Sequence, residues 1–159
     1  MHTSKGFEVM TLDKKQAWSV PELRAGSHVD DIASRLSGEK PLGMFRLSDI
    51  DLLCCYEECA VYVNKHGDIS RSVVMEFVGK GVTVAMYGPY VLVFDSDFVE
   101  IRNAQNGRLR QVISGRDVRC LDIGTDGPKG RTVKVAMAHP EAEGRQLVIE
   151  LVLNEGQRD

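Results

Sequence analysis

The sequence has no apolar run approaching the ~18 residues needed for a membrane span, and its first residues contain no apolar signal-peptide core. It also has no Asn-x-Ser/Thr sequon. An excess of one charge is missing as well. The 20 basic and 23 acidic residues give a net charge of −3, so no overall field attracts nucleic acid or anionic membrane. These absences exclude a membrane protein, a secreted mini-protein and a basic nucleic-acid-binding module, and we expect a cytosolic chain.

Motifs for catalysis and phosphate binding are absent too. No G-x-S-x-G occurs, and the glycine-rich segment 124–130 lacks the G-x-x-x-x-G-K-[ST] pattern, so we interpret it as a solvated hairpin loop. The histidines are expected at surface positions rather than as catalytic bases. They lie in a tail, a helix start, a turn and a strand end, at His2, His28, His66 and His139. We therefore predict no catalytic residue and no cofactor.

Cysteine is sparse, and three of the four cysteines fall within six residues, at Cys54, Cys55 and Cys59, with Cys120 apart. A zinc site would need two paired half-sites. Here Cys55 and Cys59 form one pair, and only His66 lies nearby in the sequence. Free cysteine often behaves as a small buried hydrophobe, and these three stand in apolar runs. We favour buried thiols in a reducing compartment and predict no metal ligand, with a metal site and a disulfide as minor alternatives.

Acidic pairs and an arginine-rich segment are the remaining candidates for chemistry. The acids occur at Asp30-Asp31, Glu57-Glu58 and Asp95-Ser96-Asp97. A turn role explains the last two better than a carboxylate-pair hydrolase does. The segment 100–119 carries five arginines, which we expect on a solvated outer-strand face, where they discourage edge pairing. Binding of an acidic partner or a phosphoinositide is the alternative for Arg102, Arg108, Arg110, Arg116 and Arg119.

Most of the chain carries the signature of short strands. Apolar residues make up 43% of the 159 residues, enough for a core in one domain or in part of a larger one. One helix is predicted over 27–38, where Ser27 can cap the start and Gly38 can end the helix. Strands are expected in a hairpin within 6–20 and then at 43–47, 51–56, 59–64, 72–78, 82–87, 90–95, 98–103, 108–114, 117–122, 131–139 and 146–154.

An internal repeat suggests how the strands are grouped. Residues 52–64 can be laid over 91–103 with an offset of 39 residues, and each copy is a strand, a two-residue turn and a strand ending in Asn. Four short strands per period of about 40 residues are typical of a β-propeller blade. We predict an all-β fold, a partial β-propeller of about three four-stranded antiparallel blades in an incomplete ring, with one short helix.

The predicted parts are a partial blade hairpin at 5–20, the helix at 27–38, blades at 43–78 and 82–114, and a last partial blade at 117–154. About three blades cannot close a ring, because propellers usually have about 4–8. No strand is expected before the first hairpin, so the chain would begin inside a blade. An open arc leaves an apolar blade face in water. We therefore expect a fragment from the C-terminal part of a larger propeller, or a chain completed by another chain that covers this face.

Several segments resemble one family. They are KGFEVMTL (5–12), PLGMFRLS (41–48), LLCCYEECAVYVNKHG (52–67), FDSDFVEIRN (94–103) and GRLRQVI (107–113). Together they resemble the citron homology (CNH) domain, in the version found at the C-terminus of fungal Rho-type guanine-nucleotide exchange factors. The resemblance runs from about Lys5 to Asn154. It implies a β-propeller used for protein–protein contact in a protein that acts on Rho-family GTPases.

The departures from the family limit what the resemblance implies. Catalysis in such exchange factors belongs to a helical Dbl-homology domain, followed by a pleckstrin-homology domain, and neither is present here. The family's CNH domain is also about twice as long as this chain. We therefore assign exchange activity to no residue of this sequence. We expect the chain to correspond only to the C-terminal half of the CNH domain.

The resulting hypothesis is a non-catalytic protein-interaction module, part of a larger protein that regulates small GTPase signalling. Its partner would be a Rho-family GTPase or a signalling scaffold, with the binding surface unassigned and no nucleic acid involved. We expect it in the cytoplasm, with recruitment to the cell cortex. The alternative is a truncated or split gene product with only a structural role. A propeller hydrolase that uses the turn acids Asp95 and Asp97 ranks last.

Overall fold

The computed structural model describes residues 2–3, 6–10, 17–20, 27–122 and 133–152, and the side chains of residues 2–30 and of Asp122 lie outside this description. Fourteen strands and one helix are found within the described residues, and the strands form four antiparallel sheets. The chain divides into two compact units, Met1–Lys80 and Gly81–Asp159. Each unit is described by itself.

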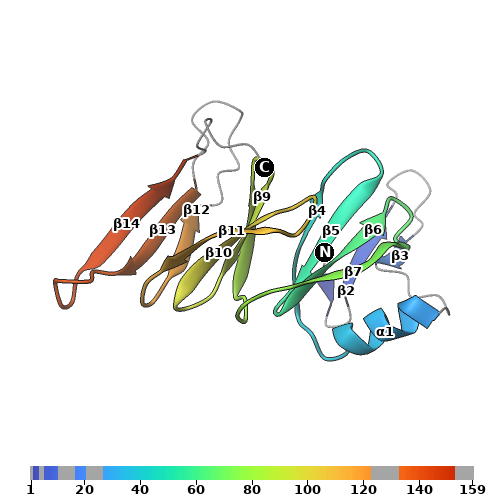
Figure 1. The fold of residues 1–159 in the computed structure, drawn as a ribbon, viewed down its shortest axis with the longest axis horizontal. Helices are drawn as coiled ribbons and strands as arrows, with labels where there is room; N and C mark the ends of the chain where they lie inside the picture. Colours follow the sequence, from blue (N-terminus) through green and yellow to red (C-terminus); the bar gives the residue numbers. More distant parts are fainter. Residues whose placement is uncertain (1, 4–5, 11–16, 21–26, 123–132, 153–159) are drawn as a thin grey trace. The chain divides into compact units, whose positions relative to one another are not determined.

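The first unit contains two sheets and the helix (Figure 1). A three-stranded sheet has the order β1-β2-β3, and a four-stranded sheet has the order β4-β5-β6-β7. The helix α1 contacts β7. The elements are β1 (His2–Thr3), β2 (Gly6–Met10), β3 (Ala17–Val20), α1 (Ser27–Leu36), β4 (Pro41–Arg46), β5 (Asp51–Tyr56), β6 (Cys59–Asn64) and β7 (Ile69–Glu76).

The second unit contains a four-stranded and a three-stranded sheet, coloured green to red in Figure 1. In both sheets the strands that follow one another in sequence are neighbours, so each sheet is a simple meander. The elements are β8 (Thr83–Tyr87), β9 (Tyr90–Phe94), β10 (Phe98–Asn103), β11 (Leu109–Ser114), β12 (Arg119–Asp122), β13 (Val133–Ala138) and β14 (Gln146–Leu151).

The register of the central hairpins confirms the internal repeat. The β5–β6 hairpin pairs Asp51 with Asn64, and the β9–β10 hairpin pairs Tyr90 with Asn103. Both partners are displaced by the offset of 39 residues found in the sequence. Because a one-residue slip would move every side chain to the opposite face, an equal register means that the two copies expose equivalent faces.

The asparagine that ends each copy organises the turn behind it. The Oδ1 atom of Asn103 accepts hydrogen bonds from the backbone N–H groups of Gln105 (2.9 Å) and Asn106 (3.1 Å). In the first copy, the Oδ1 atom of Asn64 accepts from two backbone N–H groups in the same way. The glycine of the second turn, Gly107, has a φ of 75°, a conformation that glycine adopts without steric cost.

Asn103→Ala is expected to lower the free energy of unfolding by about 1–2 kcal/mol, because two backbone donors lose their acceptor at a buried position. Urea denaturation of the full chain measures the change. Asn106→Ala is the matched control, since exposed Asn106 accepts only one described hydrogen bond, from the Arg108 N–H. An equal loss in both variants would contradict a special role for the repeat asparagine.

The helix follows the predicted start and ends two residues before its predicted boundary. It runs from Ser27 to Leu36, and Gly38 follows with a φ of 81°, the left-handed conformation that ends many helices. Ile32 is buried in the core of the first unit, and Leu36 packs against this core. The capping role predicted for the side chain of Ser27 lies outside the described side chains.

Each unit has its own apolar core, and the second unit's core is shared between its two sheets. The first unit's cluster comprises Ile32, Cys54, Tyr56, Cys59, Val61 and Val63. In the second unit, alternate residues of β9 and β10 pack against alternate residues of β13. This cluster comprises Ala85, Leu92, Phe94, Val99, Val118, Val133, Val135 and Met137.

Three strand predictions, 51–56, 59–64 and 98–103, match the structure at both ends. The prediction that no strand precedes the first hairpin was wrong, because β1 pairs with β2. Two residues with no apolar periodicity gave no signal for it. The strand predicted at 72–78 runs instead from Ile69 to Glu76, since the chain returns to pairing directly after the turn at Gly67. The predicted loop 124–130 lies outside the described residues.

Candidate functional site

The two histidines whose side chains are described, His66 and His139, each lie beside a strand end. Exposed His66 lies in the β6–β7 turn, and half-buried His139 follows β13. The Nδ1 atom of His139 accepts hydrogen bonds from the backbone N–H groups of Glu141 (3.1 Å) and Ala142 (3.0 Å), which gives this ring a turn-forming role. The side chains of His2 and His28 lie outside the described residues.

The clustered cysteines are buried thiols, as predicted. Cys54, Cys55 and Cys59 are free and buried, and Cys120 is free and half-buried. Burial raises the pKa of Cys54 and of Cys59 to about 12, so both are protonated at neutral pH. Metal binding requires the thiolate, which this environment disfavours. Among the described residues, no group of three or more histidines, cysteines and acids could hold a metal ion.

The predicted turn role is confirmed for Asp95. The Oδ1 atom of Asp95 accepts a hydrogen bond from the Asp97 N–H at 3.0 Å, which fixes the β9–β10 turn. Glu57 is paired with Lys80 at 3.5 Å (Nζ–Oε2), and the carbonyl of Glu58 accepts from the Phe77 N–H. Asp95 thus shapes its own turn, whereas the Glu57 carboxylate forms an ion pair with Lys80. Asp31 lies exposed on α1.

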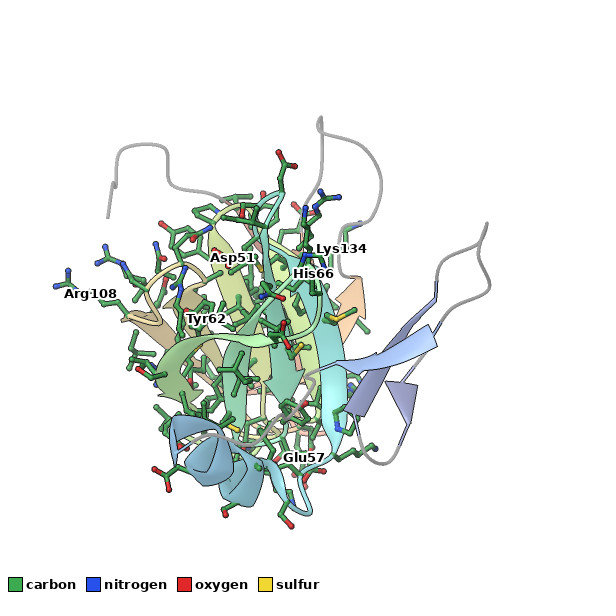
Figure 2. All side chains as sticks on the ribbon, turned by 90° about the vertical axis from the view of Figure 1, so that its right-hand side faces the viewer. Asp51, Glu57, Tyr62, His66, Arg108 and Lys134 are labelled. Atoms are coloured by element: carbon green, nitrogen blue, oxygen red, sulfur yellow. The ribbon has the colours of Figure 1, made fainter. Side chains whose placement is uncertain are left out.

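The arginine-rich segment divides into one half-buried and four exposed side chains. Arg102 does not lie on a solvated face, because its guanidinium pairs with the fully buried carboxylate of Glu100 and donates to the Gly107 carbonyl at 2.8 Å. A period-two strand pattern gave no warning that this charged pair points inward. The predicted exposure is confirmed for Arg108, Arg110, Arg116 and Arg119, and Figure 2 shows the side chain of Arg108 extending outward.

Two clefts of about 450 and 510 Å³ lie in the second unit. The smaller is lined by the β11–β12 connection and the residues around Gly144, and the larger by Phe94, Val118 and Cys120 among others. Their size suits a small ligand. Asp117 and Arg119 line both clefts with opposite charges, and Arg145 adds a second positive charge to the smaller cleft.

The β11 edge, defined as Arg108 and strand β11 (Leu109–Ser114), combines the features expected of a protein-binding surface. β11 is the first strand in the order β11-β10-β9-β8 and pairs only with β10 among the described strands. Leu109 and Val112 are 41% and 43% exposed, beside the exposed guanidinium groups of Arg108 and Arg110. No helix in the described part of the chain is long and apolar enough to span a membrane.

Comparison with known proteins gives consistent results. A family model described as the CNH domain matches residues 1–124. Rho1 guanine nucleotide exchange factor 3 of Schizosaccharomyces pombe is 33% identical over 153 residues, which cover 93% of this chain and 12% of that protein. RHO1 GDP-GTP exchange protein 2 of Saccharomyces cerevisiae is 30% identical over 122 residues, with coverages of 76% and 9%.

A solved structure described as the AfRom2 CNH domain superposes with a TM-score of 0.76 at 26% sequence identity. The match covers 96% of this chain and 46% of that chain. The chain therefore spans about a tenth of the length of the curated relatives and slightly under half of the solved domain. These matches confirm the resemblance drawn from the sequence segments.

Proposed function

Because the chain belongs to the CNH domain family, we propose that it serves as a protein-interaction module within a larger Rho guanine-nucleotide exchange factor. The observation that carries this proposal is the similarity to Rho1 guanine nucleotide exchange factor 3, which extends over 93% of the chain but only 12% of the relative. Because the matching segment is a small part of that exchange factor, we expect it to contribute only one part of the whole protein's activity.

The proposed architecture is the C-terminal part of a β-propeller, with blades at 43–78 and 82–114, a last partial blade at 117–154 and a partial blade at 5–20. Two four-stranded meanders with the same hairpin register support this grouping. The solved CNH domain, of which the chain matches 46%, supports a partial ring. The remaining blades would come from a longer chain or from another chain that covers the open blade face.

The proposed mechanism is surface recognition without chemistry. The side chains of His139 and Asp95 accept hydrogen bonds within turns, and Cys54, Cys55 and Cys59 are buried thiols. The proposed partner is a Rho-family GTPase or a signalling scaffold, named by analogy with the Rho1 exchange factors that the chain resembles. We propose a cytoplasmic protein that is recruited to the cell cortex with this partner.

The test is to measure binding and nucleotide exchange separately with the full 159-residue chain. We expect immobilised chain to retain a fungal Rho1-type GTPase or its scaffold, while the rate of release of fluorescent GDP from the GTPase stays unchanged. A Dbl-homology fragment of an exchange factor provides the positive control for GDP release. Accelerated release by this chain alone would contradict a non-catalytic role, and retention of neither partner would contradict the interaction role.

A further inference from the structure

We propose that the β11 edge binds an extended acidic segment of a partner protein, which adds to the sheet as a further strand. This inference rests on the proposed interaction function and specifies its surface and its ligand. Strand addition takes affinity from main-chain hydrogen bonds and specificity from alternate side chains. It therefore requires unpaired backbone groups on the host strand, and the register of β10 and β11 shows which groups these are.

The outward-facing backbone of β11 follows from the hydrogen bonds of its hairpin. The Gly115 N–H donates to the Asp97 carbonyl at 2.8 Å, so this pair is a hydrogen-bonded one. Because such pairs alternate along an antiparallel ladder, Val99–Ile113 is hydrogen-bonded, whereas Glu100–Val112 is not. The N–H and C=O groups of Val112 and Ser114 consequently point away from β10, toward an incoming strand.

The charge at the Arg108 end of this edge favours an acidic ligand. From Ile101 to Ser114 the chain has three arginines and no acidic residue. The charge of Arg102 is neutralised by Glu100, and the exposed side chains of Arg108 and Arg110 add positive charge along this edge. Flexible, exposed arginines contribute through complementarity, steering and hydrogen bonds to the partner's acids. Leu109 and Val112 supply apolar contacts for alternate side chains of the same segment.

Two other strands at sheet ends, β7 and β14, lack this combination. β7 ends at Glu76, whose carboxylate is held by Arg35 of α1, so part of this strand is engaged by the helix. β14 carries exposed Glu150 and has no arginine. The carboxylate of Glu150 on β14 would repel an acidic segment, and contact with the helix would hinder its access to β7.

Val112→Pro tests the backbone contact. Proline removes an N–H that the β10–β11 ladder does not use, so the fold is expected to be retained, as for prolines on natural edge strands. The probe is a fluorescent peptide with alternating valine and glutamate. We expect Val112→Pro to bind it about tenfold more weakly than Val112→Ala, which also shortens the side chain but keeps the N–H. Equal binding by the two variants would overturn the proposal.

A charge exchange tests ligand selection without altering the backbone. The double variant Arg108→Glu/Arg110→Glu is expected to bind the glutamate peptide with about tenfold lower affinity. It is expected to bind the matching lysine peptide more tightly than the wild-type chain does. Thermal unfolding of each variant verifies that it is folded. Vesicles of phosphatidylcholine with phosphatidylserine provide a competing ligand. Arginine-dependent binding of these vesicles without peptide binding would replace the proposed ligand with a membrane and overturn the inference.

The same variants separate this inference from the proposed function. If the wild-type chain retains its GTPase or scaffold but binds no acidic peptide, the interaction function stands and the β11 edge is the wrong surface. If Val112→Pro lowers both peptide and partner binding relative to Val112→Ala, the edge is the surface that the partner uses.

Discussion

Arg102→Ala is expected to lower the free energy of unfolding by about 3–5 kcal/mol, a large share of the total stability of a small domain. Glu100 is 0% exposed and Arg102 has a side-chain exposure of 14%. Removing the guanidinium leaves a buried carboxylate without its charged partner. The Gly107 carbonyl also loses the hydrogen bond that it accepts from Arg102. Both losses fall on one hairpin, β10–β11, and on the turn that joins its strands.

Urea denaturation of the full chain gives the total effect, and hydrogen exchange of the β9–β11 amides locates it. Arg108→Ala is the matched control, since Arg108 is exposed and lies six residues further along the same hairpin. Its substitution is expected to change stability by less than about 0.5 kcal/mol. Similar losses in the two variants would contradict a structural role for the buried pair.

Replacing both Glu100 and Arg102 separates two effects on the free energy of unfolding. One is the cost of burying a carboxylate without Arg102, and the other is the net contribution of the ion pair. A buried ion pair often contributes little compared with apolar residues of similar size, because its desolvation offsets its attraction. The double variant Glu100→Met/Arg102→Leu is therefore expected to be more stable than Arg102→Ala alone. A double variant less stable than Arg102→Ala would show that this position requires the charges themselves.

Much of the fold could be predicted from the sequence because its signals are local. The alternation of apolar residues, the two-residue turns and the terminal Asn of each copy all act within one hairpin, and the predicted strands 51–56 and 59–64 match both observed ends. The offset of 39 residues likewise corresponds to the equal register of the β5–β6 and β9–β10 hairpins. Burial of the cysteines followed from the apolar runs that contain them.

The contacts that the sequence could not predict depend on side-chain direction and on long separations. Glu100 and Arg102 are adjacent on one strand face, yet charged residues at this spacing are normally exposed, so their burial is visible only in the structure. Arg35 and Glu76 lie 41 residues apart. The β11 edge was visible only as an excess of arginine, because the direction of its backbone groups depends on the register.

Arg35→Ala is the second variant expected to have a large effect, about 2–4 kcal/mol. The guanidinium forms two hydrogen bonds to Glu76 of β7, at 2.8 Å (Nε–Oε1) and 2.6 Å (Nη2–Oε2). It forms a third to Glu39, at 2.6 Å (Nη1–Oε1), and the Glu39 side chain is only 6% exposed. The alanine variant leaves this buried carboxylate unpaired and removes an ionic link between α1 and β7.

The effect of Arg35→Ala also depends on pH. The hydrogen bonds from Arg35 hold the pKa of Glu76 below its ordinary value. A carboxyl whose folded-state pKa is lowered contributes stability above its unfolded pKa, about 4.3, and loses this contribution as the pH falls through the folded value. The stability difference between the wild-type chain and Arg35→Ala should therefore be constant above about pH 5 and should narrow at lower pH.

Arg46→Ala separates this link from an ordinary surface ion pair. Arg46 is 68% exposed and pairs with fully exposed Asp49 at 3.2 Å, so solvent screens this contact and we expect little change in stability. Urea denaturation between pH 7 and pH 3 compares the variants, and hydrogen exchange of residues 27–36 reports the attachment of α1. Faster exchange with a pH-independent loss of stability would contradict the contribution assigned to the Glu76 carboxylate. Unchanged exchange would show that apolar packing of Ile32 and Leu36 is sufficient to hold the helix.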